Sequence, residues 1–201
     1  MGCRWTRFPC ADVLPDLDKR QCWNRLAIPP IALAWGVMDE FSVPANLELV
    51  VFDLDFTLWD AGGSWCDCLS PPFMRAADRV VDRRGLHVRL YPDVMEIMDA
   101  LDAAGIPMGL ASRTGEPDWA RELLELLGVA GRFGFEEIYP GAKPAHFGAL
   151  RRDSGFDFGS MLFFDDESRN IRDVGALGVN CVAVQSGIVE FACTAHIALR
   201  V

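Results

Sequence analysis

Short apolar runs alternate with helical segments from residue 47 onward, and this alternation restricts the fold more than any other feature of the chain. Buried strands are predicted at 47–52, 106–112, 138–139, 161–164 and 179–184. Helices are predicted at 93–104, 117–127, 145–152 and 170–177. Repeated alternation of strand and helix is typical of a parallel sheet with helices on both faces. The sequence therefore predicts an α/β fold with a doubly wound, mostly parallel sheet of five strands.

The segment between the first predicted strand and the first predicted helix departs from this alternation. Residues 56–92 begin with a loop rich in Trp, Cys, Gly and Pro, and Val80–Leu90 then shows two strand-like runs around an Arg-Arg-Gly turn. We expect a small β-hairpin flap at about 60–91 and no large cap domain. A flap inserted here lies over the carboxyl edge of the sheet, where open α/β sheets bind their ligands.

The first 37 residues differ in composition from the rest of the chain. They contain five basic and three acidic residues, with three of the seven cysteines. The apolar stretch Leu26–Met38 is interrupted by two prolines and is too short to span a bilayer. We therefore divide the chain into an irregular N-terminal extension at 1–45, expected to be poorly ordered, and a domain at 46–201. A targeting role for the extension and a true start at Met38 remain alternatives.

The overall charge and the cysteines limit the partners and the compartment. The net charge is −10 at pH 7, and such a field repels a phosphate backbone. The cysteines form no CxxC pair, and the tight pair Cys66 and Cys68 has no second half-site for zinc. Reduced thiols are typical of the cytoplasm. We expect a cytoplasmic monomer or weak dimer without nucleic-acid or membrane partners.

Polar side chains follow four of the predicted strands. They are Asp53 with Asp55, Ser112 with Arg113, Lys143, and Asp165 with Asp166. In a right-handed parallel sheet these strand ends meet at one edge. Clustered carboxylates need a cation, and oxygen ligands without His or Cys favour Mg²⁺. Because Ser112 and Lys143 add a donor and a positive charge for an anion, the constellation predicts phosphoryl transfer.

Four segments of the chain resemble, in order, the signature motifs of the haloacid dehalogenase superfamily: VVFDLDFTLWD, GLASRT, GAKPAHF and LFFDDESRN. The resemblance covers about residues 47–188 and is closest to the small magnesium-dependent phosphatases, the magnesium-dependent phosphatase 1-like family. It implies a Rossmann-like core and an aspartyl-phosphate intermediate. On this resemblance Asp53 is the nucleophile, and Asp55 is the general acid and base.

The resemblance also assigns ligands for the metal and the phosphate. It gives Mg²⁺ the carboxylate of Asp53, the backbone carbonyl of Asp55, and Asp166, which we choose over Asp165 because such motifs usually end in Gly-Asp. The expected phosphate-binding groups are the loop amides after Asp53, including Leu54, together with Ser112, Lys143 and Arg113. Trp65, on the loop above the site, is expected to contact the substrate.

Sequence features distinguish this chain from members of the superfamily that catalyse other reactions. Haloacid dehalogenases lack the second Asp of the first motif, and ion-pumping ATPases have Lys-Thr there and large inserted domains. A phosphomutase keeps both aspartates but usually has a helical cap, and a non-catalytic protein would have lost Asp53, Asp55 or Asp166. We therefore expect a phosphatase, with these last two functions as the alternatives.

The flap also suggests the substrates. A hairpin leaves the site open to phosphates on bulky or protruding groups. Trp59, Trp65 and Phe73 are expected to supply aromatic surface at the entrance, and Arg83, Arg84 and Arg89 to favour anionic substrates. We expect aryl phosphates such as phosphotyrosine, and sugar or ketoamine phosphates, on small molecules or on phosphorylated or glycated protein side chains.

Overall fold

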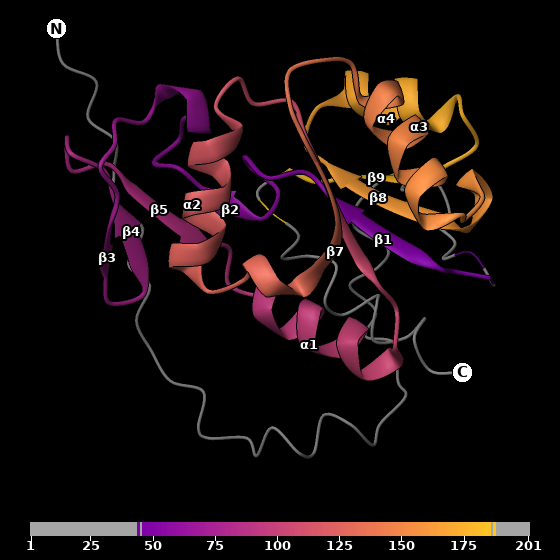
Figure 1. Cartoon of the computed structure of the whole chain (residues 1–201), viewed down its shortest axis with the longest axis horizontal. Helices are drawn as coiled ribbons and strands as arrows, with labels where there is room; N and C mark the ends of the chain where they lie inside the picture. Colours follow the sequence, from indigo (N-terminus) through magenta and orange to yellow (C-terminus); the bar gives the residue numbers. More distant parts are fainter. Residues whose placement is uncertain (1–43, 45, 186, 188–201) are drawn as a thin grey trace, which may run out of the picture. The chain divides into compact units, whose positions relative to one another are not determined.

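The computed structural model describes residues 44, 46–185 and 187, and it contains a five-stranded parallel sheet (Figure 1). The strand order is β7-β6-β1-β8-β9. The bounds are β1 (Leu49–Phe52), β6 (Met108–Ser112), β7 (Phe133–Ile138), β8 (Met161–Asp165) and β9 (Asn180–Ala183). Every adjacent pair is parallel, so the predicted fold class is confirmed.

Helices cover both faces of this sheet. They are α1 (Val94–Ala104), α2 (Pro117–Leu127), α3 (Lys143–Ser154) and α4 (Ser168–Gly175). In Figure 1, α1 lies on one side of β1, and α3 and α4 lie on the other. Successive side chains of β1 point to opposite faces of the sheet, so this strand contributes to a hydrophobic core on each face. Val50 and Phe52 pack with α1 and α2, whereas Leu49 and Val51 pack with α3 and α4. Since β1 is apolar and buried on both faces, it occupies the centre of the sheet.

The third predicted strand is longer than expected. We predicted 138–139, but β7 spans Phe133–Ile138 and Tyr139 follows it. Because β7 lies at the edge of the sheet, its middle residues are partly exposed and include Glu136 and Glu137. Such a strand lacks the continuous apolar run that marks a buried one. The next helix, α3, also begins two residues earlier than predicted, so Lys143 is its first residue.

The flap is a four-stranded antiparallel sheet and not a single hairpin. Its order is β2-β5-β4-β3, with β2 (Trp59–Asp60), β3 (Met74–Ala76), β4 (Arg79–Val81) and β5 (His87–Leu90). The predicted hairpin corresponds to β4 and β5, to which β2 and β3 are added. A 3₁₀ turn, η3 (Cys66–Cys68), lies between β2 and β3. The flap is anchored because Val80 and Val88 are fully buried in the same core as α1 and α2.

Phe73 belongs to this anchoring and not to the entrance of the site. It is 6% exposed, and its ring packs edge-on against Trp119 of α2 at 6.2 Å. The expectation that Phe73 supplies aromatic surface at the entrance is therefore wrong. The reason is that the segment between η3 and β3 runs along α2, which removes this ring from water.

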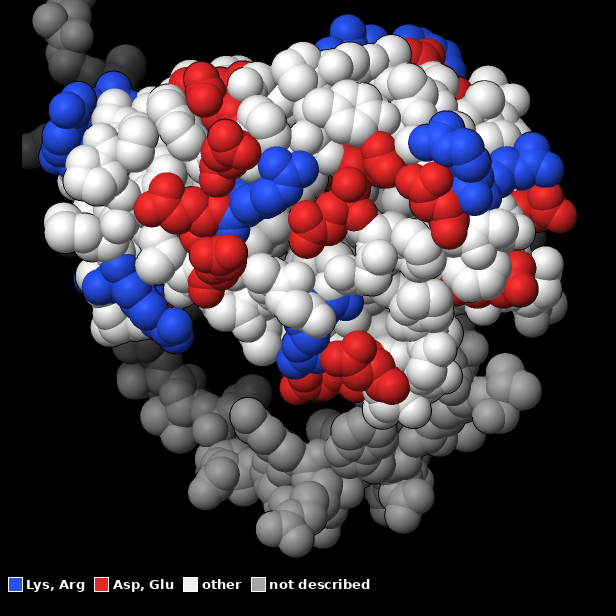
Figure 2. All heavy atoms as spheres, in the orientation of Figure 1, with Lys and Arg blue, Asp and Glu red and all other residues white. Residues whose placement is uncertain are grey.

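The proposed extension at 1–45 lies almost wholly outside the described residues, as does Met38. Its order, its targeting role and its boundary therefore stay predictions. Within the part of the chain that is described, no helix is both long and apolar enough to cross a bilayer. On the face drawn in Figure 2, basic and acidic side chains are interleaved with uncharged ones.

Candidate active site

A cleft of about 200 Å³ opens at the carboxyl edge of the central sheet, beside the flap. It is lined by Asp53, Asp55, Trp65, Asp67, Ser112, Arg113, Thr114, Lys143, Asp166, Glu167, Arg169 and Asn170. The segments that follow β1, β6 and β8, the start of α3 and the flap all contribute to it. The predicted convergence of strand ends is thus observed, because parallel strands bring their carboxyl ends to the same edge.

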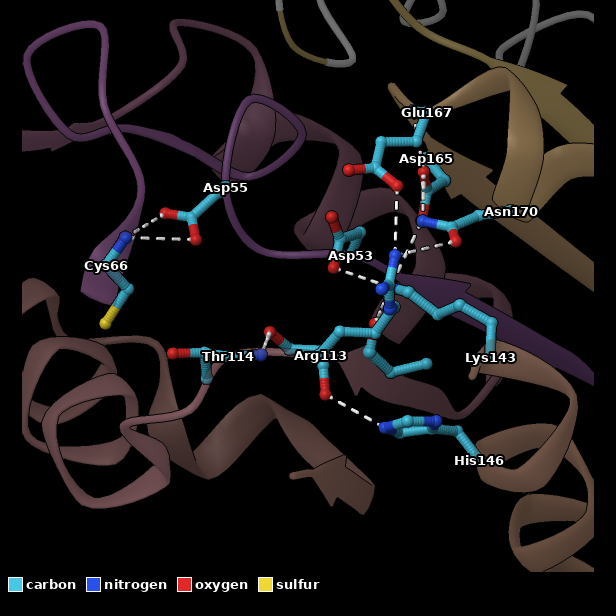
Figure 3. A network of polar contacts seen from close by, with 12 residues as sticks. Asp53, Asp55, Cys66, Arg113, Thr114, Lys143, His146, Asp165, Glu167 and Asn170 are labelled. Carbon is cyan, nitrogen blue, oxygen red and sulfur yellow. Dashed lines mark hydrogen bonds and ion pairs between the residues drawn. The ribbon is translucent and has the colours of Figure 1, made fainter. Parts of the chain in front are cut away.

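Lys143 occupies the centre of the polar network (Figure 3). Its side chain is 1% exposed, and its Nζ lies 2.6 Å from Oδ1 of Asp53 and 3.1 Å from Oδ2 of Asp165. The ammonium group also donates to the carbonyl oxygen of Ala111 and lies 5.2 Å from the centre of the Phe163 ring. Because the charge is buried, these partners fix it in one place and compensate its desolvation.

Three carboxylates gather beside this ammonium. Asp53, Asp165 and Asp166 each place an oxygen within 4.8 Å of the others. Burial, together with the charge of Asp53, raises the pKa of Asp165 to about 6. Burial and the charges of Asp53 and Asp165 raise the pKa of Asp166 to about 7. Burial also raises the pKa of Asp53, although Lys143 opposes the shift. Such a set of oxygens suits a hard divalent cation.

The two adjacent aspartates, Asp165 and Asp166, differ in their surroundings. Asp165 is fully buried, and its oxygens accept hydrogen bonds from Asn170 Nδ2 at 3.0 Å and from the Glu167 amide at 2.7 Å. Asp166 lines the cleft. Asp165 therefore has its oxygens largely occupied by protein donors, whereas Asp166 borders the open cleft.

Asp55 is held by two donors that come from the flap side of the site. Its Oδ1 accepts a hydrogen bond from Trp59 Nε1 at 2.7 Å, and the Cys66 amide lies 3.0 and 3.1 Å from its two oxygens. Figure 3 shows the Cys66 contact. Burial raises the pKa of Asp55, although both donors act against the shift. Asp55 is thus oriented separately from Asp53, with which it shares the first motif.

Trp59 is a residue whose role the sequence alone did not reveal. We expected its ring at the entrance, but it is fully buried in the core and donates to Asp55. That expectation is wrong because Trp59 pairs with Leu90 in the flap sheet, which encloses the ring. Trp65, in contrast, is 56% exposed, lines the cleft and packs edge-on against Phe56 at 5.9 Å.

The end of β6 is connected to the start of α3 by a buried histidine. His146 Nε2 lies 3.0 Å from the Ser112 carbonyl oxygen and 2.9 Å from that of Tyr139, and Nδ1 lies 3.1 Å from that of Ala142. The imidazole therefore links the strand end that bears Ser112 to the helix that begins with Lys143. Its position one turn after Lys143 was the available signal, but a single histidine on a helix is not specific.

Arg113 is held at the rim of the cleft. Its Nε donates to the Gly141 carbonyl at 2.8 Å, and its Nη1 lies 3.1 Å from Glu167 Oε2 and 3.4 Å from Asn170 Oδ1. The side chain joins the loop before α3 to the start of α4. Its predicted contact with phosphate stays a prediction.

The flap arginines that we expected to favour anionic substrates, Arg83, Arg84 and Arg89, are not among the residues that line the cleft. Arg84 contacts the Asp82 carboxylate and the Cys68 carbonyl, and Arg89 lies 3.7 Å from Asp60. The charges of Arg84 and Arg89 are therefore partly compensated within the flap, and the influence of all three arginines on anionic substrates stays a prediction.

A model of the acid phosphatase family matches residues 45–198, which is most of the chain. The chain belongs to this family. Magnesium-dependent phosphatase 1 of Homo sapiens is 48% identical over 143 residues, covering 70% of this chain and 80% of the human protein. A HAD-like hydrolase superfamily protein of Schizosaccharomyces pombe is 36% identical over 150 residues, covering 67% of this chain and 85% of its own length. The family resemblance deduced from the motifs is confirmed.

Solved structures show the same fold in distant proteins. A predicted phosphoglycolate phosphatase from Haemophilus somnus aligns with a TM-score of 0.53 at 18% identity, covering 71% of this chain and 87% of the other. A Bacteroides fragilis phosphatase domain complexed with Mg aligns with a TM-score of 0.54 at 15% identity, covering 78% of this chain and 41% of the other. At these identities the likeness establishes the fold.

Proposed function

We propose that the chain is a Mg²⁺-dependent phosphomonoester hydrolase that acts through an aspartyl phosphate on Asp53. The observation that supports this most directly is the position of Asp53. Its carboxylate lies at the end of the central strand, 2.6 Å from the buried Lys143 ammonium, and it lines an open cleft. A carboxylate held by a fixed cation in this way is suited to attack an electrophilic phosphorus.

The first chemical step forms a bond between an Asp53 oxygen and phosphorus, and the ester bond to the leaving oxygen breaks. Asp55 donates a proton to that oxygen, which leaves as an alcohol. In the second step Asp55 takes a proton from water, whose oxygen attacks phosphorus. The bond from phosphorus to Asp53 then breaks, which releases inorganic phosphate and restores both aspartates. Trp59 and the Cys66 amide hold Asp55 in place for both transfers.

The donor set of the site fits a magnesium ion. The carboxylates of Asp53 and Asp166 and the backbone carbonyl of Asp55 would hold it, and Asp166 is preferred to Asp165 because it lines the cleft. When bound, Mg²⁺ supplies positive charge that offsets the phosphoryl oxygens and these carboxylates. The human relative is named for magnesium dependence, which supports the same choice.

The phosphoryl group would be bound by residues from three segments. Ser112 and Lys143 lie at the end of β6 and the start of α3, and the Leu54 amide follows Asp53. Ser112 and Lys143 both line the cleft. Arg113 is assigned to the edge of the phosphate site, where Glu167 and Gly141 fix its guanidinium group.

The substrates that we propose are aryl phosphates such as phosphotyrosine, and sugar or ketoamine phosphates, free or on protein side chains. The exposed Trp65 supports this choice because its indole is available for stacking at the cleft. A cytoplasmic monomer or weak dimer completes the proposal. The cytoplasmic location is supported by the free thiols of the described cysteines: Cys66, Cys68 and Cys181.

Hydrolysis of p-nitrophenyl phosphate by the full chain, with and without Mg²⁺, tests the proposed function. We expect Mg²⁺-dependent release of inorganic phosphate, which Asp53→Asn abolishes because an amide does not form the acyl phosphate. Circular dichroism should show an unchanged fold. Transfer of the phosphoryl group to a sugar phosphate without net phosphate release would instead support the phosphomutase. Full activity of Asp53→Asn would contradict the mechanism.

A further inference from the structure

One acidic side chain of the flap reaches the loop that follows β6. Asp67, in the turn η3, accepts hydrogen bonds from the Gly115 amide, whose nitrogen lies 3.0 Å from Oδ2 and 3.2 Å from Oδ1. It also contacts the hydroxyl group of Thr114. Asp67 is thus a direct polar connection between the flap and the loop beside the phosphate site.

The receiving loop lies close against this carboxylate. A Cβ atom placed on Gly115 would lie 3.1 Å from Asp67 Oδ2, so a side chain there would require the carboxylate to shift by a few tenths of an ångström. The Thr114 hydroxyl accepts a hydrogen bond from the Glu116 amide at 3.1 Å, which leaves its proton for Asp67. The Thr114 amide in turn donates to Ser112 Oγ at 3.4 Å. Asp67 is therefore bound to the segment that bears Ser112.

The same short turn also holds the proposed general acid. Cys66 precedes Asp67, and its amide donates to the Asp55 carboxylate. Trp65, the next residue toward the N-terminus, lines the cleft. Because these residues are consecutive, the position of the Cys66 amide depends on where the Asp67 side chain is anchored.

We propose that Asp67 is a positioning residue that aligns Asp55, through the Cys66 amide, with the loop bearing Ser112. This role rests on the proposed function, in which Asp55 protonates the leaving oxygen. Asp67 itself forms no bond to the reacting atoms. Its loss should therefore matter most for substrates whose leaving group needs a proton.

Leaving groups of different basicity separate this role from general damage to the site. A nitrophenolate leaves without protonation, whereas the alkoxide of an alkyl phosphate needs a general acid. For Asp67→Ala we expect kcat/KM for an alkyl phosphate to fall about 10- to 100-fold, within the range of general-acid catalysis. For p-nitrophenyl phosphate we expect a decrease below about threefold, because its first step depends little on Asp55.

Three variants make the test specific. Asp67→Asn keeps an oxygen for the Gly115 amide, and its amide group can donate to the Thr114 hydroxyl, so we expect it to restore most of the alkyl phosphate activity. Gly115→Ala shifts the Asp67 carboxylate without removing it, so we expect a smaller loss that is again selective for the alkyl phosphate. Asp60→Ala is the matched control, because Asp60 is a flap acid whose partners, Gly63 and Arg89, also lie in the flap.

Hydrogen exchange of the Cys66 amide gives a readout that needs no catalysis. We expect faster exchange in Asp67→Ala and Gly115→Ala, and unchanged exchange in Asp60→Ala. Equal losses on both esters, no rescue by Asp67→Asn, or unchanged Cys66 exchange would overturn the role of Asp67. A wild-type chain that hydrolyses neither ester would instead refute the proposed function, and the catalytic role of Asp67 with it.

Discussion

The Nζ atom of Lys143 lies 2.6 Å from Oδ1 of Asp53, although ninety residues separate them in the chain. The same nitrogen lies 3.1 Å from Asp165 Oδ2. One buried ammonium therefore compensates carboxylates from two different strands, β1 and β8. Without it, the negative charges of Asp53 and Asp165 would meet where burial limits their contact with water. The contact thus serves both folding and the proposed chemistry.

Replacement of Lys143 by Met should destabilise the protein and abolish turnover. Removing one partner of a buried ion pair typically costs about 3–5 kcal/mol because the other charge is left uncompensated. Urea unfolding of the metal-free protein measures this loss. The same replacement in an Asp53→Asn background should cost less, since one carboxylate is already neutral. Equal costs in both backgrounds would show that the two residues are not coupled.

Magnesium should raise the melting temperature of the metal-free protein in a saturable way. At a concentration 100 times the Kd, binding to the folded state contributes about 2.7 kcal/mol. For a chain of this size that corresponds to a shift of about 5–10 °C. Asp166→Asn should reduce the shift strongly. Asp118→Asn, whose aspartate side chain is 97% exposed, is the control and should keep it.

Calcium should bind at the same place and inhibit. It takes about 6–8 oxygen ligands at longer distances than Mg²⁺ does, so Asp53 would be able to coordinate it through both oxygens and lose nucleophilicity. Phosphate release with Mg²⁺ should therefore fall as Ca²⁺ is added, and excess Mg²⁺ should restore it. Turnover supported equally by Ca²⁺ alone would contradict this account of the cation.

The two tryptophans of the flap should respond differently to substitution. Trp65→Ala should raise KM for aryl phosphates by about three- to tenfold with little change in kcat, because stacking contributes about 0.5–1.5 kcal/mol. Trp59→Phe should lower kcat instead, since it removes the donor to Asp55 Oδ1. Steady-state kinetics on phosphotyrosine and on a sugar phosphate would distinguish the two effects. An unchanged KM for every aryl ester in Trp65→Ala would refute the stacking role.

Acid should weaken the flap through Asp82. Burial alone would raise the pKa of this carboxyl group, but the amides of Leu86, Arg84 and Ser70 outweigh it and lower the pKa below 3.8. The pKa of Asp82 is therefore lower in the folded protein than in the unfolded chain. The ionised carboxylate stabilises the fold at pH values above its pKa in the unfolded chain, and this contribution is lost as the pH falls through its pKa in the folded protein.

Comparison with Asp82→Asn measures that contribution. The variant should be less stable than the wild type by about 2 kcal/mol above about pH 5, because the amide offers one acceptor oxygen in place of two. The difference should shrink as the pH falls below about 4. Urea unfolding at several pH values measures it. A difference that is independent of pH would show that Asp82 acts only through its shape.

Local patterns of apolar and polar residues were enough to predict the helices and the ends of the buried strands. The helices at Val94–Ala104 and Pro117–Leu127 were predicted almost to the residue because apolar spacing and the glycines that follow define them. Asp53, Ser112 and Asp165 were located at strand ends because a buried strand shows as an apolar run and the next polar residue marks its edge. Parallel connectivity then brought these ends together.

The side chains that surround each functional group depend on how distant segments pack together. Trp59 is buried because β2 pairs with β5, a contact between residues about thirty positions apart that no local period specifies. Asp67 meets Gly115 for the same kind of reason, since the flap folds back over the loop after β6. The spacing of apolar residues along a helix or strand predicts which of its side chains are buried. The partner of a polar side chain depends instead on how separate helices, strands and loops pack against one another.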